Sequence, residues 1–268
     1  MKSSCPGKPQ GSPLLRMPLE LRREIYGYIL PHTFTIGKSY RYAYWMMPSR
    51  ETWSRAPQQP VSHQEIGNDI VWRRGCTRLL ATNRQIHEEC ADMMYGDNTF
   101  VVHIAFDSIK FQYQWVVEHK EPAPGRANGC MVPNGTKDFL DHFSLRNLLR
   151  IKYYIINVEL VDSYTGMIKY NCGGRGLGFG IRQQAQDLVE LLAAAPCLHR
   201  LQLHLTSGKA SQRRQTAHES EQRELLSHTV LDPFTRLYNV RKANVTGVSA
   251  DYAALLEQSM TDSRIVPT

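Results

Sequence analysis

The chain has 268 residues, 42% of them hydrophobic, and its 32 basic and 25 acidic side chains give a formal net charge of +7. That hydrophobic content excludes a disordered chain, and no stretch reaches the roughly 18 consecutive apolar residues that a membrane-spanning helix needs. The six cysteines include no C-x-x-C pair, which argues against a zinc ribbon or a disulfide scaffold and favours an intracellular protein with reduced thiols.

The positive charge is spread along the chain. Residues 1–104 contain 13 basic and 9 acidic side chains, and residues 105–268 contain 19 and 16. A protein that binds nucleic acid usually concentrates its excess charge on one face, and a short pair such as Arg73-Arg74 does not make such a face. We therefore expect no nucleic-acid partner.

The first predicted element is a helix that ends at Leu30. Residues 1–12, which precede it, consist mainly of Lys, Ser, Pro and Gly, so we expect a disordered tail and not a signal peptide. Pro18 suits the first helical position, where its missing N–H is not needed. Pro31 prevents the helix from continuing, because the residue before a proline is restricted to extended conformations.

One side of this helix is predicted to be apolar. Leu21, Ile25 and Tyr28 recur at spacings of four and three, which places them on a common face. Arg22 and Arg23 are expected on the opposite side. No residue of this helix is a candidate for catalysis, so the sequence predicts a packing or docking element.

A long irregular stretch, residues 31–75, separates this helix from the next. Within it, residues 40–47 are rich in Tyr, Trp and Met and are expected to fold back on the core as a short strand or hydrophobic flap. The second helix is predicted over residues 77–95, where apolar residues alternate at spacings of four and three. A half-buried strand is predicted over residues 98–104, because apolar residues alternate there with polar ones.

The second half of the chain is predicted to alternate strands and helices. The predicted strands are residues 151–160, 199–205 and 239–247, and the predicted helices are residues 107–116, 138–143, 181–195, 225–231 and 249–260. Residues 120–137 are expected to form a surface loop, and residues 207–224 are expected to be mobile. This alternation implies a parallel sheet with helices packed on it.

The fold class that follows is α/β, with α+β as the alternative. A helical start would pack on a strand–helix domain that is irregular and leucine-rich-repeat-like, since its period of roughly 40 residues exceeds that of a true leucine-rich repeat. We expect residues 13–104 to contain the first helices and the 31–75 insertion, and residues 105–268 to form the strand–helix domain. The two parts could equally be one continuous domain.

No candidate chemical site is strong. His87, Glu88, Glu89 and Cys90 are all potential metal ligands, but no second histidine follows His87 at four residues, so the zinc-protease pattern is absent. No G-x-S-x-G motif is present to carry a nucleophile. We therefore expect no catalytic residue, no metal and no cofactor.

The glycine-rich residues 171–180 lead into a predicted helix, and phosphates bind where a glycine-rich loop enters a helix. However, these glycines do not have the G-x-G-x-x-G spacing, and no Lys-Ser or Lys-Thr follows them. The sequence favours a flexible connection and leaves binding of a phosphate ligand as a weaker alternative.

Two segments resemble a known family. Residues 17–29, Met-Pro-Leu-Glu-Leu-Arg-Arg-Glu-Ile-Tyr-Gly-Tyr-Ile, resemble the first helix of an F-box, and Thr-Asn-Arg-Gln-Ile at residues 82–86 is similar to a later F-box element. The chain is also similar to a large family of filamentous-fungal F-box-like proteins. Its hallmarks are matched by residues 79–100, which contain RQIHEE and YGDNTF, and by the Asp-Pro segment at residues 232–240.

This resemblance implies a non-enzymatic adaptor. F-box helices bind the Skp-type subunit of a cullin-RING ubiquitin ligase, while the carboxy-terminal domain selects a substrate. Carried over to this chain, the residues that would meet the Skp-type subunit are Met17, Pro18, Leu21, Ile25 and Tyr28.

A second interpretation remains open. The 31–75 insertion departs from the F-box pattern, and so do Asn83 and Ile86, which stand in place of a cysteine and a tryptophan. In this alternative, the chain is a self-contained α/β domain of unknown binding role whose F-box-like helices belong to the core.

Overall fold

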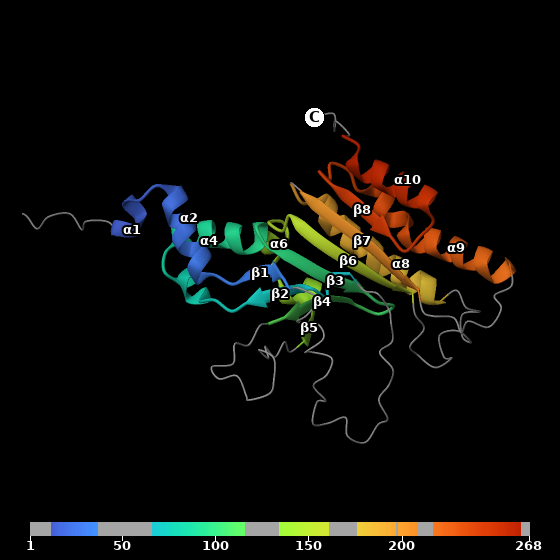
Figure 1. Ribbon diagram of the computed structural model, residues 1–268, viewed down its shortest axis with the longest axis horizontal. Coiled ribbons are helices and arrows are strands. Elements are labelled where there is room, and N and C mark those ends of the chain that lie inside the picture. Colours follow the sequence, from blue (N-terminus) through green and yellow to red (C-terminus); the bar gives the residue numbers. More distant parts are fainter. Residues whose placement is uncertain are drawn as a thin grey trace, which may run out of the picture.

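A six-stranded mixed sheet forms the centre of the computed structural model, which describes residues 12–36, 66–115, 134–160, 176–196, 198–207 and 217–263 (Figure 1). The strands follow the spatial order β5-β4-β3-β6-β7-β8. The parallel strands are β3 (Thr99–Ile104), β6 (Tyr153–Leu160), β7 (Arg200–Ser207) and β8 (Ala243–Thr246). The antiparallel strands β4 (Ile109–Gln114) and β5 (Asn134–Asp138) extend the sheet beyond β3. The chain therefore has an α/β fold.

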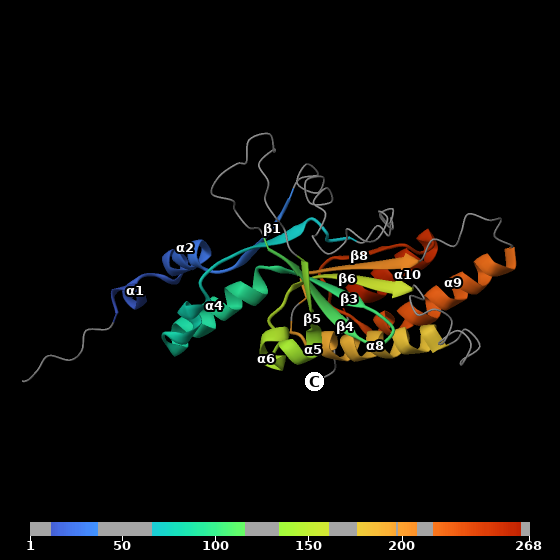
Figure 2. The same cartoon turned by 90° about the horizontal axis from the view of Figure 1, so that it is seen from below.

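One face of the sheet is hydrophobic, because apolar and other side chains alternate along its strands. The buried side chains of this face include Phe100, Val102, Ile104, Tyr154, Ile156, Val158, Leu201, Leu203 and Leu205. The helices that cover it are α8 (Gly176–Ala193), α9 (Ala217–Leu231) and α10 (Ala250–Thr261), with the short η3 (Asp232–Arg236) between the last two (Figure 2). Two short helices, α5 (Phe139–His142) and α6 (Leu145–Leu148), lead into β6.

The opposite face of the sheet carries several polar side chains besides the buried Val101 and Ile155. The ring Nδ1 of His204 lies 2.8 Å from the Thr246 hydroxyl. Asn157 is buried, and its side chain donates to the carbonyl of Ile66 at 2.9 Å and accepts from the amide of Ile66 at 3.1 Å. The side-chain amide of Asn157 therefore fixes the chain at Ile66 against the sheet, as the backbone of a neighbouring strand would.

The amino-terminal helices lie beyond one end of the sheet (Figure 1). They are α1 (Pro13–Arg16), α2 (Leu19–Ile29), η2 (Thr77–Ala81) and α4 (Arg84–Gly96). Two short strands, β1 (His32–Thr35) and β2 (Ile70–Arg73), form an antiparallel ribbon in which Thr35 is opposite Ile70. Asn98 tethers this ribbon to the end of α4, because its Oδ1 accepts from the amide of Thr33 at 2.6 Å.

The carboxy-terminal edge of the sheet depends on a tight approach of two chain segments. Gly247, just after β8, has φ +88°, and a Cβ atom at this position would lie 2.2 Å from the carbonyl oxygen of Leu205. On the outer side of the same strand, the amide of Val245 donates to the Glu257 carboxylate of α10 at 2.7 Å. Both contacts fix α10 to this edge.

Several sequence-based predictions are confirmed. Strands were expected at residues 98–104, 151–160, 199–205 and 239–247, and β3, β6, β7 and β8 lie there. The last three are parallel neighbours, as the strand–helix alternation predicted. The antiparallel β4 and β5 depart from a leucine-rich-repeat arrangement, in which all strands are parallel.

The predicted helix from Asp107 is wrong. Ile109 and Tyr113 fit a helical spacing, but Ile109, Phe111 and Tyr113 also alternate, as residues of a strand do. A turn in which the amide of Ala105 donates to the backbone carbonyl of Ser108 brings this segment beside β3. Because it pairs with β3, the segment forms the strand β4 and not a helix.

Four further segments differ from expectation. The predicted 77–95 helix is two elements, because Asn83 caps α4 by accepting a hydrogen bond from the amide of Gln85 at 2.7 Å. The 31–75 stretch contains β1 and β2, while the predicted flap at residues 40–47 lies outside the described residues. Residues expected to be loop or mobile belong instead to the starts of α8 and α9.

None of the helices described is long and apolar enough to cross a bilayer.

Candidate docking site

Helix α2 packs on α4 through a small core of its own. Tyr26 and Leu30 of α2 are buried against Ile86 and Cys90 of α4. The spacing of four residues on each helix aligns these side chains on the facing sides. Burial raises the pKa of the Cys90 thiol to about 11, so this cysteine is a packed, unreactive thiol.

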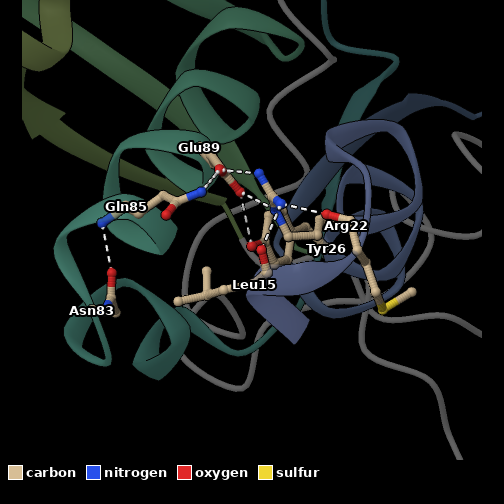
Figure 3. Close-up of polar contacts among 7 residues, drawn as sticks. Leu15, Arg22, Tyr26, Asn83, Gln85 and Glu89 are labelled. Atoms are coloured by element: carbon tan, nitrogen blue, oxygen red, sulfur yellow. Dashed lines mark hydrogen bonds and ion pairs between the residues drawn. The ribbon is translucent and has the colours of Figure 1, made fainter. Parts of the chain in front are cut away.

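An ion pair between the buried Arg22 and the half-buried Glu89 holds the two helices together (Figure 3). Arg22 of α2 binds Glu89 of α4 with two parallel hydrogen bonds, from Nε to Oε2 at 2.9 Å and from Nη2 to Oε1 at 2.5 Å. Arg22 Nη1 also donates to the carbonyl of Met17 at 2.5 Å. The Tyr26 hydroxyl donates to Glu89 Oε2 at 3.0 Å, and Gln85 Nε2 donates to Oε1 at 2.9 Å. A bidentate arginine–carboxylate pair of this kind fixes the relative orientation of the two helices as well as their contact.

The titration of these groups reflects the same geometry. Hydrogen bonds from Arg22 hold the pKa of Glu89 below its ordinary value, and the bond to Glu89 raises the pKa of Arg22. Burial, followed by the hydrogen bond to Glu89, raises the pKa of Tyr26 to about 12. Arg22 and Glu89 therefore remain charged, and Tyr26 remains protonated, throughout the neutral range.

The Glu89→Gln variant should be less stable than the wild type at neutral pH and should lose less stability on acidification. A glutamate whose folded pKa is lowered stabilises the fold above its unfolded pKa of about 4.3, and that contribution disappears as pH falls through the folded pKa. At pH 7 the free energy of unfolding should fall by more than about 0.5 kcal/mol, the size typical of substitutions on the surface. Urea unfolding between pH 7 and pH 2 measures both effects, with the exposed Glu24→Gln as the control. Identical pH dependence in wild type and variant would contradict this linkage.

The five residues predicted to meet a partner lie at the start and on the outer side of α2. Leu21 is 50% exposed and Tyr28 is 89% exposed, whereas Ile25 is half-buried. Pro18 was predicted at the first helical position, but it is exposed and stands at the N-cap of α2, one position earlier. Met17 is half-buried and accepts the hydrogen bond from Arg22 described above.

The sequence left open whether the apolar side of α2 packs on the chain or docks on a partner. Arg22 was expected on the side opposite Leu21, Ile25 and Tyr28, and it is this side that is buried, with Arg22, Tyr26 and Leu30 at spacings of four. The sequence did not indicate that the stripe containing a charged residue would face inward. The signal that was missed is the pairing of Arg22 with a carboxylate 67 residues away, which spacing within one helix cannot reveal.

The sequence His87-Glu88-Glu89-Cys90 has a structural role. His87 Nδ1 lies 2.8 Å from the carbonyl oxygen of Leu80. Glu88 and Glu89 point to different sides of α4, because Glu88 binds Arg150 whereas Glu89 binds Arg22. Among the residues that the structure describes, no group of three or more His, Cys, Asp or Glu side chains could hold a metal ion.

The glycine-rich segment is helical where the structure describes it, from Gly176 onward, and its glycines allow close packing. A Cβ at Gly178 would lie 2.4 Å from the Leu226 side chain of α9, and one at Gly180 would lie 2.4 Å from the Phe106 ring. Arg182 is paired with Asp232 at 2.9 Å. These contacts favour packing over phosphate binding for this part of the segment; residues 171–175 lie outside the described chain.

Comparison with known proteins gives one finding. Residues 8–117 match a family described as a domain of unknown function, DUF7730. This region contains α1, α2, the β1–β2 ribbon, α4, β3 and β4, so the matched family includes the candidate docking helix and its anchor. No curated protein and no solved structure matches the chain.

Proposed function

We propose that this protein is a non-enzymatic adaptor that acts inside the cell, docks through α2 onto the Skp-type subunit of a cullin-RING ubiquitin ligase, and presents its α/β sheet domain to a substrate. The observation that carries the proposal is the division of α2 into two faces. Arg22 and Tyr26 are buried against α4, while Leu21 and Tyr28 on the outer side are exposed.

This division is what helix-in-groove recognition requires. A docking helix offers apolar anchors at spacings of about i, i+4 and i+7, which insert into a groove of the partner. Leu21, Ile25 and Tyr28 have that spacing. A tyrosine with 89% of its side chain exposed is also unusual for a purely structural residue, because large aromatic side chains are normally buried.

The anchoring of α2 supports the same proposal. A docking helix that is already fixed binds at a smaller entropic cost than one that must fold on its partner. The bidentate pair between Arg22 and Glu89 fixes both the position and the rotation of α2. The alternative, that the F-box-like helices only form core, leaves the exposure of Leu21 and Tyr28 without a purpose.

Co-expression of the full chain with a fungal Skp-type subunit, followed by size-exclusion chromatography, tests the proposal. The wild type should co-elute with the subunit, and the Leu21→Asp/Tyr28→Asp variant should bind more than about 100-fold more weakly, because central anchors each carry about 2 kcal/mol or more. Both side chains are exposed, so the variant should keep the wild-type Tm.

The matched control is Leu255→Asp, which changes a leucine on α10 that is 55% exposed and far along the chain from α2. It should co-elute as the wild type does. Failure of the folded wild type to co-elute would overturn the proposal, and so would undiminished binding by the double variant.

A further inference from the structure

Three arginines stand beside the last turn of α2. Arg73 ends β2, Arg74 follows it, and Arg78 lies in η2. The chain between them is fixed to α2, because the amide of Cys76 donates to the carbonyl of Ile29 at 2.7 Å. Gly75 allows this approach, since a Cβ there would lie 2.3 Å from the backbone nitrogen of Pro31.

These three arginines differ from the two arginines of α2 in having no carboxylate partner in the described parts of the chain. Arg22 is paired with Glu89, and Arg23 is paired with Asp97. Arg73, Arg74 and Arg78 are exposed, and none forms an ion pair or a side-chain hydrogen bond in the described parts of the chain. Three like charges without partners are electrostatically costly to keep together, so an external anion would stabilise them.

We propose that Arg73, Arg74 and Arg78 form a basic rim of the docking face and bind acidic side chains that lie beside the apolar groove of the partner. The inference rests on the proposed function, since it assigns the chemistry of the surface that α2 meets. Ile29, which holds this segment, is the residue after Tyr28 in the chain, so the rim adjoins the apolar anchors. Arginine suits this task because its planar guanidinium binds a carboxylate with two hydrogen bonds.

A protein partner fits this surface better than a nucleic acid. The outer side of α2 also carries the exposed carboxylates Glu20 and Glu24. A nucleic-acid backbone carries negative charge along its whole length and would meet these two carboxylates as well as the arginines. A folded protein can place its acidic side chains opposite the arginines alone, with apolar side chains opposite Tyr28.

The test measures the affinity of the full chain for the Skp-type subunit by isothermal titration calorimetry in about 50 mM and about 500 mM NaCl, where the Debye length falls from about 14 Å to about 4 Å. The R73E/R74E/R78E variant should bind about 10- to 100-fold more weakly than the wild type at low salt, and the difference should shrink at high salt. The control R200E/R236E/R241E changes three exposed arginines of the sheet domain and should shift the affinity by less than about threefold.

The outcomes separate this inference from the proposed function. Wild-type binding that the R73E/R74E/R78E change leaves intact at low salt would overturn the basic rim and leave the adaptor proposal standing. Absence of binding by the folded wild type would overturn both. Tighter binding of the wild type to a short DNA or RNA duplex than to the subunit, lost in R73E/R74E/R78E, would assign the arginines to nucleic acid and overturn the inference.

Discussion

Replacing Tyr26 by alanine should detach α2 from α4 while the six-stranded sheet stays folded. Tyr26 is fully buried and is the largest side chain of a small core whose other buried members, among the described residues, are Leu30, Ile86 and Cys90. Truncating a buried aromatic residue to alanine costs about 3–5 kcal/mol. The same change removes a hydrogen bond from Glu89. So small a core cannot redistribute this loss, whereas the main core is formed mainly by the sheet, the helices that cover it and Ala91 and Tyr95 of α4, without a described residue of α2.

Hydrogen exchange followed by mass spectrometry measures this local release. Amides of α2 should exchange much faster in Tyr26→Ala than in the wild type, whereas amides of β6 should keep their protection. The matched control is Tyr28→Ala, which removes the same side chain two positions later from a site that is 89% exposed, and it should leave both sets of amides unchanged. Simultaneous loss of protection in α2 and β6 would show that the helices and the sheet unfold together.

The Gly247→Ala variant should destabilise the sheet domain by about 3 kcal/mol or more. Its φ of +88° is a backbone conformation that alanine rarely adopts, and the new Cβ would lie 2.2 Å from the carbonyl oxygen of Leu205. That neighbour is backbone, so it cannot turn away as a side chain could. Either β8 moves from β7 or the chain after β8 changes its course, and both loosen α10.

Urea unfolding followed by circular dichroism gives the change in the free energy of unfolding. Gly27→Ala is the control, because Gly27 lies in α2 and a Cβ there would have no atom within 4 Å. It should stabilise α2 by about 0.5–1 kcal/mol, since alanine favours the helix over glycine. An unchanged urea midpoint for Gly247→Ala would mean that the approach to Leu205 is not required.

The parts of the fold that sequence reasoning predicted are those whose pattern is local. The strand β6 consists mainly of β-branched and aromatic residues, and α10 follows Ser249 at its N-cap. Pairing between distant segments carries no such signal. The parallel contact of β3 with β6, which joins residues 99–104 to 153–158, could not be read from either strand alone.

In the candidate site, too, contacts between distant segments could not be predicted from the sequence. The outer apolar residues of α2 could be named from their spacing, and two of them are exposed. Which side of α2 faces inward depended on the pairing of Arg22 with Glu89, and a buried charge is predictable only when its partner is known. In the sequence, Arg73-Arg74 was too short a pair to indicate a binding face and Arg78 was not singled out, because the position of this segment beside α2 depends on the hydrogen bond between Cys76 and Ile29.

The β1–β2 ribbon allows the chain to carry a long insertion at little thermodynamic cost. Thr35 and Ile70 are opposite each other, so the intervening chain leaves and returns at one point, and the helices on either side keep their contact. Loop-closure entropy grows only with the logarithm of length, so doubling such an insertion costs about 0.6 kcal/mol. The ribbon is therefore a natural graft point, where evolution or an engineer could exchange one insert for another without moving α2 from α4.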